Sequence, residues 1–488
     1  MTLRLLVSIL ALTSFIDQTR VVAFAISPRS TPLPSSSIQA TVPPTTAKNN
    51  IMRTKNPQDS SLRGGAALTK TALKTTTTAT AVSATKPEKK LRLLALDGAR
   101  FLLCTHIVLG HFFRFANPPT FLLKFFSQIN VTVGAFFALS GYVSAYTTTE
   151  VGERKASSKL TSTPSQKWWL SKCMGYYPMH AFVLLLFSPM FLYSDVSVLG
   201  WPKAILHGII SVTLTQAWFP MHAEVWNAPT WYLSSLTFST AVLPFSLPKI
   251  AGMDKQGLRR TAGWLFLVNL LPVLGYLYDH NTWGLVEGMT IPKHHPALAV
   301  FNAQRFLPVF NTAEILMGVV ACRLAMLDTL ENKDKSIKTT WLSTAVPLVG
   351  LVGILATRAA GLVPECSDLL VRSLFFTPLF LKFVMGTHRN AVAKINDPVS
   401  SFLSSKAMVW LGGLSFPIYI VHGPIGQMFF KKIIATSLWG RVLNGPEYFV
   451  GYLATVLMSA YLLQTFFLQN KAVKDWSKKK VDQLSSWM

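Results

Sequence analysis

The sequence predicts an all-α protein, a polytopic integral membrane bundle of about ten to eleven transmembrane helices. Two observations lead to this fold class. Half of the 488 residues are hydrophobic and only 14% are charged. Apolar runs long enough to cross a bilayer recur from about residue 102 to residue 467, a pattern that soluble globular domains do not show.

The apolar runs place the expected membrane helices in order along the chain. The run at 203–219 is the weakest, because His207, Thr213 and Gln216 interrupt it, and it could instead lie in the membrane interface or line a cavity. The expected spans are 101–116, 125–146, 173–193, 203–219, 230–248, 263–278, 304–327, 341–357, 369–386, 407–430 and 448–468.

The N-terminus has the composition of a targeting segment. Residues 1–25 read as a signal peptide, with a basic Arg4, an apolar run after it and small residues near the end. Residues 26–90 are rich in Ser, Thr, Pro, Ala and Lys, so we expect a disordered, transit-like segment. The tripeptide Ala23-Phe24-Ala25 resembles the boundary motif of proteins sent to the complex plastids of algae. A plastid membrane is therefore the favoured location, and a secretory signal leading to the endoplasmic reticulum, the Golgi or another endomembrane is the alternative.

The formal net charge of +25 is divided between the N-terminal segment and the rest of the chain. Residues 1–90 hold twelve Lys or Arg against three acidic residues, a net charge of +9. Much of the remainder lies in loops and in the basic tail 471–488, where we expect it to contact the lipid heads of the bilayer. Nucleic acid is not an expected partner, because the basic residues do not interleave with aromatic residues in a soluble module. No feature of the sequence indicates an oligomeric state.

No metal site is expected from the cysteines and histidines. The four cysteines stand far apart, without C-x-x-C spacing, and we expect them to pack as small apolar side chains. The adjacent pair His294-His295 has no further ligands near it in the sequence.

The stretch 96–113, LDGARFLLCTHIVLGHFF, places an aspartate, an arginine and two histidines in an expected membrane helix. A charged side chain at the centre of such a helix costs roughly 2.5 to 3.5 kcal/mol on insertion scales. Arg100 and His111 are eleven residues apart, which on one helix leaves them within about 20° of the same face and about 16 Å apart along the axis. His106 lies about 140° away from His111 around that helix. We therefore expect Arg100 and His111 to serve one elongated ligand and His106 to be structural.

These residue types suit acyl transfer to a hydroxyl. An alcohol is a weak nucleophile at neutral pH, so the reaction benefits from a base that removes its proton during attack. A histidine, with an ordinary pKa of about 6.5, is largely neutral near pH 7 and can take that proton. An arginine cannot act as a base, but it can hold a phosphate or carboxylate by paired hydrogen bonds.

Four ordered blocks resemble the acyltransferase-3 family of polytopic membrane O-acyltransferases. The opening stretch matches the leading block of the family through Arg100 and His111, and FFALSGYV matches its aromatic-pair and Ser-Gly signature. The third block, SKCMGYYPMH, matches a basic segment before a Tyr-Pro-x-His helix start. The fourth, TWYLSSLTFSTAVLP, follows the family's Trp-x-Leu-Ser order. The matching residues of the last three blocks are Phe136, Phe137, Leu139, Ser140 and Gly141, then Lys172, Tyr177, Pro178 and His180, then Trp231, Leu233, Ser234 and Pro244.

Weaker matches follow further along the chain. FNTAEILMGV places Glu314 and Gly318 where the family carries a Glu and a Gly. LGGLSFPIYIVHGPI resembles the late Ser-aromatic-x-x-Tyr-x-x-His segment of the family, with Ser415, Tyr419 and His422. The resemblance covers roughly residues 90–470, and it implies a membrane acyltransferase domain over 91–470.

The resemblance implies a membrane-embedded acyltransferase. It would move an acyl group, which we expect to be acetyl, from acyl coenzyme A to a hydroxyl of a glycan, a lipid or a small molecule. His111 would be the general base, and Arg100, Lys172 and Ser140 would contact the donor. Ser140 is not expected to be an acyl-carrying nucleophile, because it lacks a G-x-S-x-G turn.

Departures from the family pattern keep two alternatives open. Gly175 stands where many members carry an arginine, so Lys167 or Lys172 would have to supply the charge for the donor phosphate, and Leu236 and Thr237 stand where many carry acidic residues. An inactive member that acts as a sensor or scaffold is one alternative. The other is a transporter or proton-coupled carrier that uses Arg100 and His111. For three further polar residues a structural role is the favoured interpretation: Asp97, His207 and His422.

Overall fold

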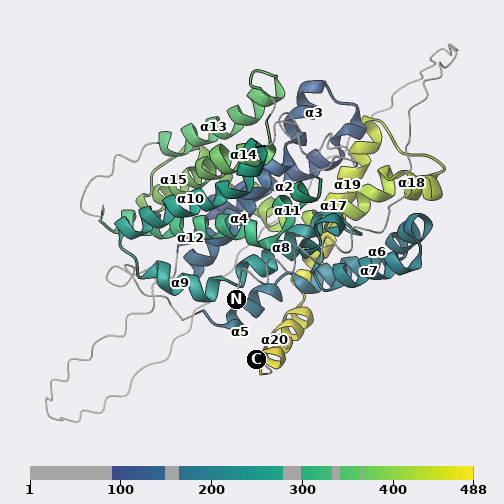
Figure 1. The fold of residues 1–488 in the computed structure, drawn as a ribbon, viewed down its shortest axis with the longest axis horizontal. Helices are drawn as coiled ribbons and strands as arrows, with labels where there is room; N and C mark the ends of the chain where they lie inside the picture. Colours follow the sequence, from purple (N-terminus) through teal and green to yellow (C-terminus); the bar gives the residue numbers. More distant parts are fainter. Residues whose placement is uncertain (1–90, 149–163, 279–297, 332–340, 365, 487–488) are drawn as a thin grey trace, which may run out of the picture. The chain divides into compact units, whose positions relative to one another are not determined.

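The computed structural model describes residues 91–148, 164–278, 298–331, 341–364 and 366–486. Residues 88–488 form one unit by their contacts, and its secondary structure over the described residues is helical throughout (Figure 1). The predicted signal peptide 1–25, the predicted disordered segment 26–90 and the pair His294-His295 lie outside the described residues. The all-α fold class is therefore confirmed for the part of the chain that the structure describes.

The helices follow one another along the described parts of the chain. Two segments are π-helical: η6 connects α14 to α15, and η7 continues α19. The α-helices are α2 (Leu94–Phe112), α3 (Thr120–Ser127), α4 (Ile129–Thr148), α5 (Gln166–Cys173), α6 (Tyr177–Leu199), α7 (Trp201–Val212), α8 (Trp231–Thr240), α9 (Leu243–Ala251), α10 (Lys255–Tyr278), α11 (Leu298–Phe306), α12 (Pro308–Glu331), α13 (Leu342–Ala359), α14 (Asp368–Val371), α15 (Thr377–Ala393), α16 (Pro398–Leu403), α17 (Lys406–Phe430), α18 (Lys432–Trp439), α19 (Pro446–Leu462) and α20 (Lys471–Ser485), and the shorter helical segments are η1 (Phe113–Ala116), η2 (Gln216–Trp218), η3 (Pro220–His222), η4 (Ala228–Thr230), η6 (Arg372–Phe376) and η7 (Leu463–Leu468).

Seven helical stretches in the described residues are long and apolar enough to cross a membrane. Each of them overlaps one of the expected spans. The predicted membrane character is thus confirmed, whereas the predicted count of ten to eleven helices is not. The seven stretches are Thr120–Thr148, Gln166–Leu199, Leu298–Thr329, Leu342–Ala359, Asp368–Ala393, Lys406–Phe430 and Pro446–Leu468.

The other four expected spans fold as helices that are too short or too polar for this class. The run at 203–219 ends as a regular helix at Val212, and Leu214 then adopts a left-handed backbone with φ of 52°. The run at 230–248 is divided between α8 and α9 by a turn after Thr240. Helices α2 and α10 keep their expected helical form but carry charged side chains in their first turns or shortly after.

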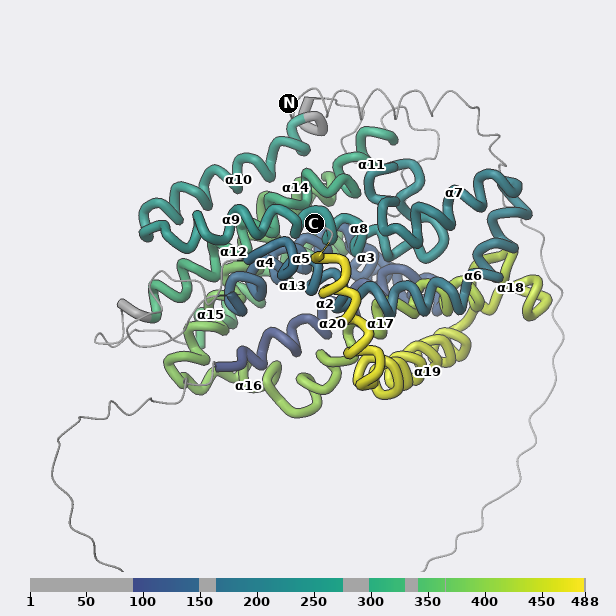
Figure 2. Tube along the Cα trace, turned by 90° about the horizontal axis from the view of Figure 1, so that it is seen from below, coloured from purple at the N-terminus to yellow at the C-terminus, as the bar shows by residue number. Residues whose placement is uncertain are grey.

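Helices α4 and α12 pack against each other in the middle of the unit (Figures 1 and 2). A Cβ atom on Gly141 would lie 1.9 Å from the Ile315 carbonyl oxygen, and one on Gly318 would lie 1.9 Å from that of Ala138. These distances leave no room for a side chain, so both glycines are required for the close approach of the two backbones. Two glycines of the motif blocks therefore have a packing role.

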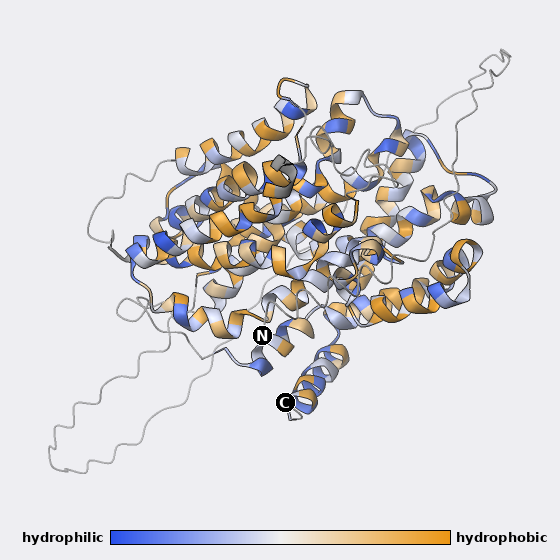
Figure 3. Ribbon diagram, in the orientation of Figure 1, coloured by the Kyte–Doolittle hydropathy of each residue, from blue (hydrophilic) through white to orange (hydrophobic). Residues whose placement is uncertain are grey.

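The outer helices present large apolar side chains to the surroundings, as the hydropathy colouring of Figure 3 illustrates. Leu185 on α6, Val349 on α13 and Val450 on α19 are 74%, 70% and 64% exposed. A water-soluble protein rarely exposes large apolar side chains on several long helices. This surface is that of an integral membrane protein whose outer helices contact lipid.

Helix α17 lies along α2, and this pairing positions the candidate site. The predicted basic tail also has a defined structure, because α20 forms over Lys471–Ser485 and packs against α5 (Figure 2). Asn470 starts α20 by accepting a hydrogen bond from the amide of Ala472 at 2.8 Å.

Candidate active site

One cavity of about 460 Å³ collects the residues that the sequence analysis selected. Arg100 and His111 on α2, Ser140 on α4 and Lys172 on α5 all line it. The other walls of the cavity come from α8, α11 and α17 and from the segment that precedes α8. Helix α2 runs unbroken through both Arg100 and His111, so the predicted separation of about 16 Å along one face applies.

Arg100 lies near the start of α2, at the end of the cavity opposite His111. Its Nη1 atom is 3.5 Å from Oδ1 of Asp97, and Arg92 pairs more closely with the same carboxylate at 2.9 Å. Asp97 does not cap the helix, because the cap residue is Leu93 and no side chain bonds there. Arg100 makes no hydrogen bond with a described residue, so its guanidinium donors remain available to an anion in the cavity.

Lys172 lies in the last turn of α5, on the same cavity. Its Nζ atom is 5.0 Å from the ring centroid of Trp168, a cation–π distance. It forms no ion pair with a described residue. Arg100 and Lys172 thus both contribute positive charge to the lining of the cavity.

Ser140 has its hydroxyl committed to neighbours. Its Oγ donates to the carbonyl oxygen of Phe136 at 2.8 Å and lies 3.3 Å from the Tyr232 hydroxyl. Because the single hydroxyl proton of the serine points to a carbonyl, the tyrosine is the donor in the second contact. No described histidine lies within hydrogen-bond distance of Ser140. The geometry supports a positioning contact and not a nucleophile.

His111 contacts a second histidine, and the bonding pattern defines the tautomers of both rings. His111 Nδ1 is 3.1 Å from His422 Nε2, and His422 Nδ1 is 2.7 Å from the carbonyl oxygen of Tyr419. A carbonyl only accepts, so His422 carries its proton on Nδ1 and, when neutral, has a bare Nε2. His111 must then donate from Nδ1, which leaves the lone pair on its Nε2. That nitrogen makes no hydrogen bond with a described residue.

His422 is held rigidly behind His111. It is fully buried on α17, and its own carbonyl accepts a hydrogen bond from Tyr452 at 3.3 Å. The two imidazoles lie stacked, with their ring centroids 5.2 Å apart and their planes 23° from parallel. The Tyr419 hydroxyl in turn donates to the Pro229 carbonyl at the cavity wall. From the sequence, a structural role is the favoured interpretation of His422, and no pattern there predicts its contact with His111.

Other histidines lie away from this centre. His106 is buried against Phe125 and Phe126 of α3, at ring centroid distances of 5.9 and 5.6 Å, and does not line the cavity. His207 Nδ1 bonds Asp195 at 2.7 Å, between α6 and α7. His106 thus packs against aromatic rings and His207 forms a polar contact between two helices, and neither lines the cavity. Among the described residues, no group of three or more His, Cys, Asp or Glu side chains could hold a metal ion.

The positions that depart from the family pattern lie on or beside the cavity. Gly175 and Leu236 line it. The Thr237 hydroxyl is 2.7 Å from that of Tyr176, another lining residue. A glycine or an apolar residue at these positions gives the cavity wall another shape and charge than the family pattern would. His111 and Arg100 still line the cavity.

An ion pair that the sequence analysis missed lines the cavity wall beside α11. Arg305 Nη2 is 3.3 Å from Glu224 Oε1, and both residues line the cavity. They stand 81 positions apart in segments with no clear periodicity, so no local pattern connected them.

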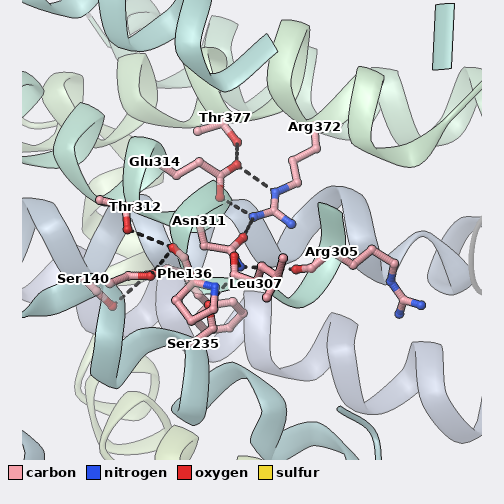
Figure 4. Close-up of polar contacts among 12 residues, drawn as sticks. Phe136, Ser140, Ser235, Arg305, Leu307, Asn311, Thr312, Glu314, Arg372 and Thr377 are labelled. Atoms are coloured by element: carbon pink, nitrogen blue, oxygen red, sulfur yellow. Dashed lines mark hydrogen bonds and ion pairs between the residues drawn. The ribbon is translucent and has the colours of Figure 1, made fainter. Parts of the chain in front are cut away.

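A buried ion pair lies between α12 and η6 (Figure 4). Arg372 Nε donates to Glu314 Oε1 at 2.7 Å, and a second nitrogen donates to Oε2 and to Asn311 at 2.8 Å. The Thr377 hydroxyl donates to the same carboxylate at 3.1 Å. Neither charged residue lines the cavity. Glu314, a weak motif match, therefore holds helices together, and the sequence analysis offered no partner for it.

The chain is similar to known acyltransferases over most of its length. Residues 93–464 match the family model described as "Acyltransferase domain". The chain is also similar to Acyltransferase MdmB of Streptomyces mycarofaciens, with 23% identity over 361 residues, which cover 69% of this chain and 79% of that protein. No solved structure matches the chain significantly.

Proposed function

The chain belongs to the acyltransferase-3 family, and from that premise we propose that it transfers an acyl group from acyl coenzyme A to a hydroxyl. Acetyl is the proposed group. One observation carries the proposal: Arg100, His111, Ser140 and Lys172 line a single cavity although they come from three helices.

His111 is the proposed base. The Nε2 lone pair takes the proton of the acceptor hydroxyl while that oxygen attacks the thioester carbonyl carbon. A carbon–oxygen bond forms, the carbon–sulfur bond breaks, and the coenzyme A thiolate leaves and takes the proton back from the imidazolium. His422 accepts the Nδ1 proton of His111 in a hydrogen bond throughout, which stabilises the imidazolium and fixes the tautomer.

Arg100 and Lys172 are the proposed contacts for the anionic part of the donor. Both cations line the cavity, and Arg100 lies about 16 Å along the α2 axis from His111. An extended acyl coenzyme A fits this arrangement, since its phosphates lie far from its thioester. Ser140 contributes by holding the Tyr232 hydroxyl at 3.3 Å beside the cavity.

The acceptor is proposed to be a hydroxylated lipid, glycan or small molecule. Aromatic and aliphatic side chains of Phe136, Trp231 and Phe416 line the cavity, which suits a ligand with an apolar part. The Glu224–Arg305 pair offers a charged contact for a polar head.

Membership of this family supports an enzyme over a transporter that would use the same residues. The proposed location is a plastid membrane, reached through a signal peptide at 1–25 and a transit-like segment at 26–90. The matched family segment begins at residue 93, after both segments.

The experiment that tests the function uses a knockout in the native cell, re-expressing either the wild type or His111→Gln. Untargeted profiling of lipids and metabolites should detect acyl esters that disappear in the knockout and return with the wild type alone. Purified protein in nanodiscs should then release coenzyme A thiol from acetyl coenzyme A when the identified hydroxyl compound is added. Unchanged ester profiles across the three strains would refute the proposal.

A further inference from the structure

The C-terminal helix α20 lies beyond the segment that matches the family and packs directly on α5 (Figures 1 and 2). Val481 is buried in this contact, and Lys167 Nζ lies 2.7 Å from Asp482 Oδ1. The hydrogen bond and charge of Lys167 lower the pKa of Asp482, so this carboxylate is ionised near neutral pH. The helix is thus attached to α5 by an apolar contact and an ion pair.

A second cavity of about 690 Å³ lies between α5 and α20. Three lysines line it, Lys167, Lys474 and Lys478, against the single acidic residue Asp482, so the lining carries a net charge of +2. Lys474 and Lys478 are one helical turn apart and form no ion pair with a described residue. This basic groove, defined by Lys167, Lys474 and Lys478, is therefore suited to a ligand with more than one negative charge.

The basic groove adjoins the candidate active site. Gly175 borders both cavities, so the wall between them has no side chain at this position. A Cβ atom on Gly175 would meet only backbone atoms of its own turn within 4 Å. Trp168 lines the groove, and Lys172, which lines the site cavity, contacts its ring. The two cavities therefore lie next to each other at Gly175.

We propose that the basic groove between α5 and α20 binds the phosphorylated nucleotide end of acyl coenzyme A. The inference rests on the proposed function and extends its donor site. Lys474 and Lys478 contact the phosphates, Trp168 provides an aromatic face for the adenine ring, and the flexible arm passes Gly175 to bring the thioester toward His111. A membrane lipid also carries phosphate, so the experiment must distinguish the two sources.

The test is a charge reversal in the full-length protein, Lys474→Glu with Lys478→Glu, in nanodiscs. The matched control is Lys471→Glu with Lys479→Glu, which changes the net charge of the same helix equally at positions that do not line the groove. The KM for acetyl coenzyme A should rise about tenfold or more in the groove variant and stay near that of the wild type in the control. With S-acetyl-N-acetylcysteamine, a donor without phosphates, groove and control variants should match the wild type.

An equal loss of activity with both donors in the groove variant would overturn the inference, because it would mean that α20 has only a structural role. An unchanged KM for acetyl coenzyme A would overturn it as well. Comparing nanodiscs of phosphatidylcholine alone with nanodiscs that contain phosphatidylglycerol separates the phosphate sources. If the difference between groove and control variants appears only with phosphatidylglycerol, the groove binds lipid heads and the inference is wrong.

A binding measurement keeps the inference separate from catalysis. Adenosine 3′,5′-bisphosphate should bind the wild-type protein in calorimetry, and the groove variant should bind it about tenfold more weakly than the control variant does. Equal binding to the two variants would overturn the inference even when acyl transfer is intact. A clear difference in affinity between the two variants would support the inference even if no acyl transfer is detected. In that case the proposed function would be wrong, whereas nucleotide binding in the groove would be supported.

Discussion

His111 Nδ1 lies 3.1 Å from His422 Nε2, across the contact between α2 and α17. The Tyr419 carbonyl behind His422 makes the second histidine an acceptor toward the first. His111 is therefore held with its lone pair on Nε2, as a general base in the cavity requires. This relationship leads to two separate predictions, one for each ring.

His111→Gln should lower acyl transfer by roughly 10² to 10⁴-fold, because glutamine keeps much of the size and hydrogen bonding of histidine but cannot take a proton. The measurement is the turnover of purified protein at matched concentration, with donor binding measured alongside. His106→Gln is the control, since His106 lies on the same helix α2 but packs against α3 and does not line the cavity. Near-normal turnover in His111→Gln would remove His111 as the base.

His422→Leu should lower kcat by about 10- to 100-fold with little change in either KM, because His111 loses the acceptor that fixes its tautomer. His422→Gln should recover part of this loss, since the amide oxygen can accept from His111 Nδ1. Steady-state kinetics of the two variants, with thermal unfolding measured in parallel, provide the check. If the Gln variant is as slow as the Leu variant while both remain folded, the acceptor role is wrong.

Arg100→Ala should weaken use of the acyl donor by roughly ten- to a hundredfold and leave use of the acceptor nearly unchanged. Loss of a charge-assisted contact typically costs about 1.5 to 3 kcal/mol, and Arg100 has no hydrogen bond with a described residue that would otherwise occupy it. Titration of each substrate at saturating concentration of the other measures the two effects. An unchanged KM for the donor would show that the anion binds elsewhere.

The part of the site that lies on one helix could be predicted from the sequence. Arg100 and His111 share a face of α2 because helical periodicity relates positions eleven apart, and the structure brings both to one cavity. Helical periodicity also separates His106 from them, and His106 packs against α3 and does not line the cavity. The helical class and the membrane character of the chain could be predicted from its apolar content.

Contacts between distant helices could not be predicted. His422 is 311 positions from His111, and no local pattern relates two positions so far apart. The sequence signal for His422 was its spacing from Tyr419 in one motif. This spacing indicated that the segment is important, but it did not identify His111 as the partner of His422. The predicted count of ten to eleven helices is not confirmed for a related reason, since the breaks after Val212 and Thr240 depend on tertiary packing that apolar content does not record.

The mature protein should lack roughly the first 25 to 90 residues, because that segment has a targeting composition and cannot bury a core. N-terminal sequencing of protein purified from its own cell is the measurement. An intact Met1 or Thr2 would contradict the prediction. A fluorescent fusion of residues 1–90 should accumulate in the plastid, and accumulation in the secretory pathway would favour the endomembrane alternative.

The Glu314–Arg372 pair provides the prediction for stability. Glu314 is 1% exposed and Arg372 is 4% exposed, and Asn311 and Thr377 satisfy further bonding positions of the pair. Glu314→Ala leaves a buried, unpaired guanidinium and should destabilise the fold by about 3 to 5 kcal/mol. Thermal unfolding in detergent measures this loss.

Two further variants show whether the unpaired charge causes that loss. Replacing both partners by methionine removes the charges together and should restore much of the stability, since uncharged side chains of similar size carry no desolvation penalty. Glu224→Ala breaks the pair with Arg305, in which the carboxylate is 48% exposed. Because this pair is partly in solvent, its loss should change the free energy of unfolding by no more than about 1 kcal/mol. A double methionine variant less stable than Glu314→Ala would mean that the buried pair stabilises the helices through its hydrogen bonds, and that an unpaired charge is the smaller effect.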